Sequence, residues 1–350
     1  PAFEDANGDL RIKRVWEQLI TSQNYPPPSG FNYGMELSSS TDILAMQHDA
    51  VQDNNGNWVA NGSHGTHVAG IAAGSDNPVN GIYGGCAPNA DLVFTSMASV
   101  DNIVDGISYI FDYAASVNKP AVINMSLGQA AGPHDGASLL DQAYTGLVSG
   151  TGKVLVGAAG NEGQDMQHLG HSFPGLDSIY ASVNLDPTNG SPNDDQVTIE
   201  AWGEPNTDFC FGVQIYDPGL TTYSGTQWIC ASSDATSSAQ FTGSDGGVAT
   251  IEGSCEGSSS LNSKPHIEYT IQVTTNDYVI IALGNPTGSN TVNMWITNPG
   301  YGMVQWTQWG GPISQYLTPG DNNMSVGEIG GTGTHIISVG AYTSKDQWTD

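Results

Sequence analysis

The pattern of apolar residues changes once along this chain, near residue 165, and this change constrains the fold more than any other feature. Before it, apolar stretches at 91–99 and 120–127 flank a stretch of helical period at 101–116. A further helical stretch is followed by the apolar residues 153–158. Because apolar strands that alternate with helices are typical of a parallel sheet covered on both faces, we predict an α/β fold for this part.

After residue 165, apolar and polar residues alternate in short segments, and no helical period appears for about 150 residues. This pattern predicts an antiparallel β-sandwich or jelly roll. Residues 334–342 again have the composition of a buried strand. We therefore predict a three-layer α/β domain with a parallel sheet over residues 1–165, an inserted antiparallel β-sandwich or jelly-roll domain over 166–318, and a resumed, incomplete α/β domain over 319–350.

The charge balance excludes two classes of partner. The chain has 7 Lys and Arg against 35 Asp and Glu, a formal net charge of −28, and residues 154–263 contain no lysine or arginine. Such a surface repels a nucleic-acid backbone and an anionic membrane. No apolar run approaches the roughly 18 residues that a membrane-spanning helix needs. We interpret the acidity as favouring solubility in a harsh or salty exterior.

The first chemical motif is GSHGTHVAG, residues 62–70. It places His64 at the start of a predicted helix over 64–76, flanked by glycines that let its imidazole face a cleft. The predicted packing face of this helix consists of Val68, Ala69, Ile71 and Ala72.

Two further motifs, VINMSLG and GAAGNEG, each include the end of an apolar strand. The second contains Asn161, whose primary amide lies at the carboxyl end of its strand. An amide in that position can donate a hydrogen bond to an oxyanion that forms in the crevice there.

These three motifs, in this order, resemble those of the subtilase family, the subtilisin-like serine proteases of peptidase family S8. The resemblance covers residues 1–163 and about 320–350, and subtilases with a jelly-roll-like insertion after the oxyanion segment exist. It implies that His64 is the general base and that Asn161 stabilises the tetrahedral oxyanion. It also implies that the backbone of Ser126, Leu127 and Gly128 pairs with an extended peptide.

The same resemblance implies that His67 is a packed or hydrogen-bonded structural residue. It further implies an orienting Asp before the histidine motif, but no acid there follows an apolar strand or has a glycine two residues on. The first three residues, Pro1-Ala2-Phe3, resemble a sequence that follows this Asp in some subtilases, so we expect the Asp upstream of Pro1.

The nucleophilic serine of the family lies in a GTSMA-x-P stretch that opens a helix. TSMAS at 95–99 is similar, but it lacks the preceding Gly and the following Pro, and it ends a predicted strand. We therefore reject it and expect the serine downstream of Asp350.

The predicted function is that of a serine endopeptidase, which hydrolyses a peptide or protein substrate through an acyl-enzyme and requires no cofactor. The alternative is a catalytically inactive, protease-like binding or scaffold protein. The N-terminus shows no initiator Met and no basic-then-apolar signal sequence, and we expect an extracytoplasmic protein (secreted, periplasmic or cell-surface) from which a signal peptide was removed. No role is assigned to the β-insert.

No metal site is assigned. His168 and His171 have ligand-like spacing without a carboxylate or thiolate pattern, so we expect them in a loop. The acidic segments 194–196 and 321–323 have oxygen ligands but no spaced calcium signature, and structural calcium stays unassigned.

The cysteines do not form a disulfide framework. Cys86 lies among small and apolar residues and is predicted to be a buried free thiol. One pair among Cys210, Cys230 and Cys255 could be bridged, and the sequence leaves the pair open.

Overall fold

The computed structural model describes most of the chain. The described residues are 2–45, 50–52, 58–60, 63–76, 84–97, 102–185, 195–217, 219, 221–242, 246–274, 277–285, 288–297, 306–307 and 311–341. They divide into two compact units, each described by itself below. The first is Pro1–Ile123 with Leu147–Val154, and the second is Asn124–Gly146 with Leu155–Asp350. None of the described helices is long and apolar enough to cross a membrane.

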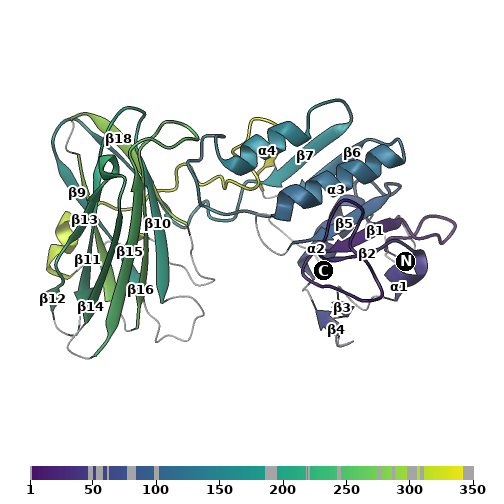
Figure 1. Ribbon diagram of the computed structural model, residues 1–350, viewed down its shortest axis with the longest axis horizontal. Helices are drawn as coiled ribbons and strands as arrows, with labels where there is room; N and C mark the ends of the chain where they lie inside the picture. The colour runs from purple at the N-terminus through teal and green to yellow at the C-terminus, as the bar shows by residue number, and fades with distance from the viewer. Residues whose placement is uncertain are drawn as a thin grey trace, which may run out of the picture. The chain divides into compact units, whose positions relative to one another are not determined.

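The first unit is built around a three-stranded sheet of order β2-β1-β5 (Figure 1). β1 (Ile12–Glu17) pairs antiparallel with β2 (Met35–Leu37) and parallel with β5 (Leu92–Ser96). The remaining elements are α1 (Ser40–Leu44), β3 (Ala50–Gln52), β4 (Trp58–Ala60), α2 (His64–Ala73) and α3 (Asn102–Ser116).

An aromatic cluster and one face of α3 form much of the core of this unit. The Trp16 ring is fully buried and lies 4.4 to 5.2 Å, centroid to centroid, from three other rings, those of Phe31, Tyr33 and Tyr109. The buried residues of α3 include Ile103, Ile107, Phe111 and Ala114, which follow the helical period predicted from the sequence.

A second three-stranded sheet has the order β20-β7-β6. Its strands are β6 (Ala121–Met125), β7 (Lys153–Ala158) and β20 (Ile336–Val339), and α4 (Leu139–Leu147) connects β6 to β7. β20 runs parallel to β7, so residues far apart in the sequence meet in one sheet, and the predicted return of the α/β fold near the C-terminus is confirmed.

Burial in β6 differs from the prediction that both faces of each strand are covered. Ile123 and Met125 are buried, whereas Val122 is 69% exposed and Asn124 is also exposed. Successive side chains of a strand point to opposite faces of the sheet, so only one face of β6 is covered among the described residues. We predicted one parallel sheet, but the described residues of this part form two sheets of three strands each.

Two larger antiparallel sheets make up most of the second unit, one of order β14-β15-β16-β10-β18-β8 and one of order β12-β11-β17-β9-β19 with β13 paired to β11. The strands are β8 (His168–Phe173), β9 (Ser178–Leu185), β10 (Gln196–Trp202), β11 (Cys210–Asp217), β12 (Thr222–Tyr223), β13 (Gln227–Cys230), β14 (Thr236–Thr242), β15 (Val248–Glu256), β16 (His266–Val273), β17 (Asp277–Gly284), β18 (Asn290–Ile296) and β19 (Trp306–Thr307). Short 3₁₀ turns lie at Ala231–Ser233 and Gly311–Tyr316.

Both large sheets contribute to one hydrophobic core. Val213 and Ile215, two positions apart on β11, are fully buried in it, and so is Ile199 of β10. The predicted change to antiparallel strands after residue 165 is therefore confirmed. That these strands form an inserted jelly-roll domain with boundaries at 166 and 318 stays a prediction.

This shared core predicts a large loss of stability for Ile271→Ala in β16. Ile271 is fully buried, and removal of such a side chain costs about 2–5 kcal/mol of unfolding free energy. The neighbouring Gln272 points to the exposed side, so Gln272→Ala should cost no more than about 0.5 kcal/mol. Denaturant unfolding of the two variants measures both values, and equal losses would contradict the assignment of the core.

Candidate active site

The candidate general base opens α2 in the first unit. His64 is the first residue of this helix, and its side chain is exposed. The carbonyl of Ser63, the N-cap residue, accepts a hydrogen bond from the His67 N–H at 2.9 Å, which closes the first turn. The helix start therefore leaves the His64 imidazole accessible to an approaching molecule.

α2 packs through a different face from the predicted one. Ala69 and Ala73, one turn apart, are buried, whereas Ile71 is 61% exposed. Residues two apart on a helix project about 200° from each other, so Ile71 cannot share the face of Ala69. His67 is exposed as well, so it is not packed in the interior, and a hydrogen-bonded structural role stays an expectation.

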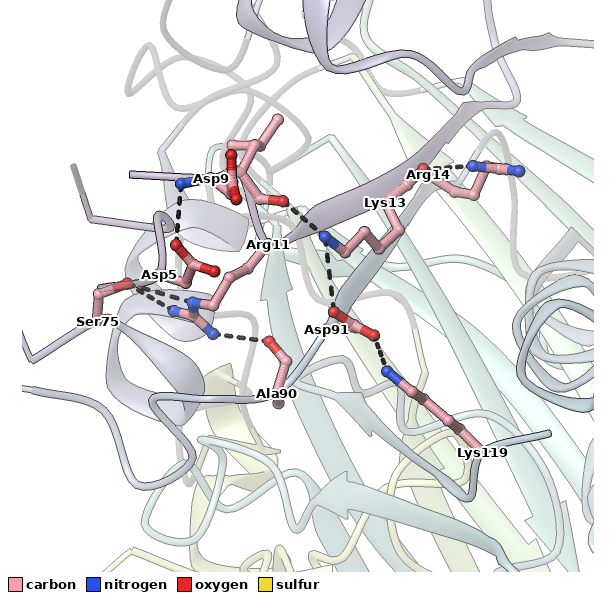
Figure 2. Close-up of polar contacts among 10 residues, drawn as sticks. Asp5, Asp9, Arg11, Lys13, Arg14, Ser75, Ala90, Asp91 and Lys119 are labelled. Carbon is pink, nitrogen blue, oxygen red and sulfur yellow. Dashed lines mark hydrogen bonds and ion pairs between the residues drawn. The ribbon is translucent and has the colours of Figure 1, made fainter. Parts of the chain in front are cut away.

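The buried guanidinium of Arg11 holds the C-terminal end of α2. Arg11 is 3% exposed and donates hydrogen bonds to the carbonyl oxygen of Ala73 and to Ser75 Oγ. Figure 2 shows the same guanidinium reaching the Ala90 carbonyl, 2.7 Å away. Carbonyls at a helix end lack partners within the helix, so Arg11 supplies one and ties α2 to the segment before β5.

Arg11→Lys tests this anchor. Lysine keeps the charge but cannot present a planar fork to three acceptors, so we expect a loss of about 1–3 kcal/mol in unfolding free energy. As a control, Lys119→Ala removes an exposed partner of Asp91 and should cost less than about 1 kcal/mol. Denaturant unfolding measures both, and a smaller loss for Arg11→Lys than for Lys119→Ala would contradict the anchor.

The candidate substrate-binding residues Ser126, Leu127 and Gly128 directly follow β6 in the second unit. Ser126 and Leu127 are half-buried and Gly128 is exposed. A Cβ placed on Gly128 would lie 3.9 Å from the Cα of Gly160. The segments after β6 and after β7 therefore lie side by side, as the carboxyl ends of neighbouring strands do.

The candidate oxyanion donor Asn161 is exposed and follows a glycine that the geometry requires. Gly160 has φ +106°, and a Cβ there would lie 2.6 Å from Glu162 Oε2. The same Oε2 accepts the Asn161 N–H at 2.7 Å. This bond uses the backbone N–H of Asn161 and not its side-chain amide.

A small cavity lies next to these two segments within the second unit. Its volume is about 10 Å³, enough for one water molecule. It is lined by Gln129, Ala130, His134, Glu162, Gln167, His168, Trp295, Asp321, Ser325 and Gly327.

His134 is the most constrained of these lining residues. Its Nδ1 lies 2.8 Å from the Val326 carbonyl oxygen, and its Nε2 lies 2.8 Å from that of Ala130. Its ring stacks on the Trp295 indole, with centroids 4.2 Å apart and planes 3° from parallel. Burial lowers the pKa of His134, although the two carbonyls raise it. His134 joins the loop after β6 to the segment before β20.

Glu328 lies beneath the same loop and is 1% exposed. Its Oε1 accepts the His134 backbone N–H at 2.6 Å. Burial and the nearby buried carboxyl of Asp141 raise the pKa of Glu328 to about 7, against opposing hydrogen bonds from Ser138 and His134. Glu328 therefore holds a proton at pH values where an ordinary glutamate has lost it.

The raised pKa of Glu328 predicts a pH dependence of stability. The folded carboxyl binds its proton more tightly than the unfolded one, whose pKa is 4.5, so its contribution is present below pH 4.5 and is lost as the pH rises to about 7. Glu328→Gln should remove this part of the slope in a series of melting temperatures. Glu252→Gln, at an exposed position, should leave it, and an unchanged slope in Glu328→Gln would contradict the assignment.

His168 and His171 do not lie in a loop as expected, since both belong to β8. Both ring nitrogens of His168 have partners: Nδ1 lies 2.7 Å from Asp321 Oδ1, and Nε2 lies 3.1 Å from Asn293 Oδ1. The carboxylate of Asp321 also accepts the Asn323 and Gly170 N–H groups. Among the described residues no cluster of three or more His, Cys, Asp or Glu is arranged to hold a metal.

The structure also shows which cysteines are bonded and where Ser96 of the TSMAS segment lies. Cys210 and Cys230 form a disulfide between β11 and β13, while Cys255 is free and buried. Cys86 is exposed, so the prediction of a buried thiol was wrong. Ser96 is the last residue of β5 and its hydroxyl donates to Glu17, which agrees with the rejection of TSMAS as a nucleophile motif.

Three residues around the cavity, His134, Trp295 and Glu328, were missed by the sequence reasoning. Each is a single polar or aromatic residue without a motif, and they lie as much as 194 positions apart. No local signal distinguishes them, because their contacts depend on strands and loops that meet only in the folded chain.

The chain belongs to the subtilase family, since the family model described as Peptidase S8, subtilase family, matches residues 29–350. Among curated relatives, a subtilisin of Bacillus sp. (strain TA39) is 29% identical over 200 residues, which cover 54% of this chain and 42% of the relative. The major intracellular serine protease of Bacillus subtilis (strain 168) is 35% identical over 130 residues, 35% of either chain. The chain thus spans less than half the length of these relatives.

The fold is similar to that of the solved Clostridium perfringens CspB protease. The TM-score is 0.71 with 21% sequence identity, and the match covers 98% of this chain and 65% of that one. At this identity the likeness concerns the fold alone, which is a subtilase fold of mixed α/β type with additional antiparallel sheets.

Proposed function

We propose that the protein is a serine endopeptidase that cleaves peptide bonds through an acyl-enzyme. The observation that carries the proposal is the match of the subtilase family model over residues 29–350, combined with exposed His64 and Asn161 in the motifs that resemble those of the family. In the proposed reaction, His64 accepts the proton of the nucleophilic serine and returns it to the leaving amine, and Asn161 donates to the tetrahedral oxyanion.

We further propose that Ser126, Leu127 and Gly128 bind the substrate backbone as an added strand. Their position beside Gly160, the residue before Asn161, supports this role. Main-chain hydrogen bonds give affinity that tolerates many sequences, so the substrate is a peptide or protein rather than a small ester.

The nucleophilic serine and the orienting aspartate are proposed to lie outside residues 1–350. The coding sequence on either side tests this directly. An Asp-Ser/Thr-Gly strand upstream and a GTSMA helix downstream would support the endopeptidase. A complete gene without both would instead support the inactive, protease-like binding or scaffold protein.

The β-sheets of residues 166–318 are proposed to be an inserted domain of this protease, and no role is assigned to them. An extracytoplasmic location, whether secreted, periplasmic or cell-surface, is proposed from the acidic composition. Cell fractionation with an antibody against the chain tests the location, and a purely cytoplasmic signal would overturn it.

Labelling with a fluorophosphonate tests whether the full gene product has an activated serine. We expect labelling in the parent protein and its loss in His64→Ala, because the serine is a weak nucleophile without its base. His171→Ala, on β8, serves as the matched histidine control and should label normally. Labelling that survives in His64→Ala would overturn the role of His64.

Asn161→Ala tests the oxyanion donor by peptide hydrolysis. Loss of one such donor from a subtilisin costs about 100- to 1,000-fold in kcat, and we expect the same order here with KM little changed. A loss in KM alone, with kcat retained, would contradict an oxyanion role.

A further inference from the structure

On the face away from the shared core, the six-stranded sheet that contains β11 carries a row of four residues, with a large aromatic residue at each end and two buried residues between them. Cross-strand pairing places Trp228, Gly212, Ala282 and Tyr180 in one row over β13, β11, β17 and β9. The two central residues are small, whereas Trp228 is 47% and Tyr180 is 40% exposed. Three strand spacings, about 14 Å, separate the two aromatic positions.

The next row toward the strand ends forms the floor of an open hollow. It contains Cys230, Cys210, Gly284 and Ser178 in register. The hollow has a volume of about 350 Å³ and is lined by Leu176, Asp177, Ser178, Cys210, Gly284 and Asn285.

The Trp228 indole lies flat on the sheet beside this hollow. A Cβ on Gly212 would come within 2.7 Å of the indole ring atoms, and a Cβ on Gly284 within 3.7 Å. Glycine at position 212 is thus what allows the ring to rest on the backbone. One face of the indole is covered by the sheet, and the exposed remainder presents an aromatic surface at the rim of the hollow.

A carboxylate is held in the same hollow. Asp177 is exposed, and its Oδ1 accepts the Ser178 N–H at 2.7 Å. Its backbone carbonyl accepts the N–H of the buried Asn285 at 3.0 Å. These bonds fix the position of Asp177 near the strand end without neutralising its charge.

The sequence around this site lacks lysine and arginine. Residues 154–263 contain no lysine or arginine, but 14 Asp and Glu. Lys264, the first cation after them, is paired with Asp135 at 2.9 Å. Cation–ring contacts among the described residues occur at Tyr113 and Phe111. The exposed indole, which lies beside Gly284, and the carboxylate of Asp177 in the lining of the hollow can both attract an external cation, the first by the ring quadrupole and the second by charge.

We propose that this hollow binds a lysine or arginine side chain of a basic peptide or protein, with the cation between the Trp228 ring and Asp177. Charge complementarity favours this occupant over a neutral saccharide, because the hollow offers a fixed carboxylate and the side-chain amide of Asn285 already donates to the Gly175 carbonyl. None of the residues that line the hollow is a proposed catalytic residue, and the proposal does not depend on proteolysis.

Isothermal titration of the 350-residue chain with the capped peptide acetyl-GRGRGRG-amide tests the proposal. The matched ligand has citrulline in place of each arginine, which keeps the shape and removes the charge. We expect binding of the arginine peptide that weakens with salt and at least tenfold weaker binding of the citrulline peptide. Equal binding of both peptides, or no binding of either at millimolar concentration, would overturn the proposal.

Three variants locate the site. Trp228→Leu keeps an apolar cover over Gly212 without an aromatic face and should weaken binding about three- to thirtyfold. Asp177→Asn should weaken it about two- to fivefold. Glu252→Gln removes one exposed charge from the other sheet and should have no effect.

Two outcomes of these measurements would refute the site. If Glu252→Gln weakens binding as much as Asp177→Asn, the peptide responds only to net charge. Maltose could bind to the parent protein but not to Trp228→Leu, while the arginine peptide binds equally to both. In that case the hollow is a saccharide site. Unchanged melting temperatures of Asp177→Asn and Trp228→Leu show that any lost binding does not arise from unfolding.

Discussion

The second unit depends on one constraint, that the buried polar groups of its loops find partners. The 2.8 Å hydrogen bond from the Gly132 N–H to the Glu200 carboxylate is an example. A buried polar group without a partner costs about 1–3 kcal/mol, so each loop folded against a sheet needs matching side chains. Burial, the largest single effect, raises the pKa of Glu200, but the His266 imidazole 3.7 Å away and hydrogen bonds from Gly132 and Trp202 lower it overall. The carboxylate therefore stays ionised as an acceptor.

The same sheet supplies the partners of a second loop. Trp295 Nε1 of β18 donates to the Met324 carbonyl at 3.1 Å, and His168 of β8 contacts Asp321. Trp295 also stacks on His134. The strands that pack a hydrophobic core on one face thus use their other face to order the loops that flank the proposed oxyanion segment, which couples the order of those loops to the integrity of the sheet.

Two surfaces of the second unit depend on glycine for different reasons. At Gly160, φ of +106° and the approach of Glu162 exclude a side chain, so the turn that presents Asn161 requires glycine. At Gly212 the backbone is extended, and glycine instead provides room for the Trp228 ring. The first glycine lies inside a motif. The second has no sequence signature, and only the pairing of β11 with β13 reveals what it does.

The sequence by itself determined the elements and the family. The period of the apolar residues predicted α3 and the strands after residue 165, because periodicity is a local property, and the motifs around His64 and Asn161 predicted the subtilase resemblance. Only the tertiary structure decided which face of α2 is buried, that Cys210 bonds to Cys230, and that His134, Trp295 and Glu328 meet. These outcomes depend on contacts between residues distant in the chain, and such contacts have no local pattern from which they could be predicted.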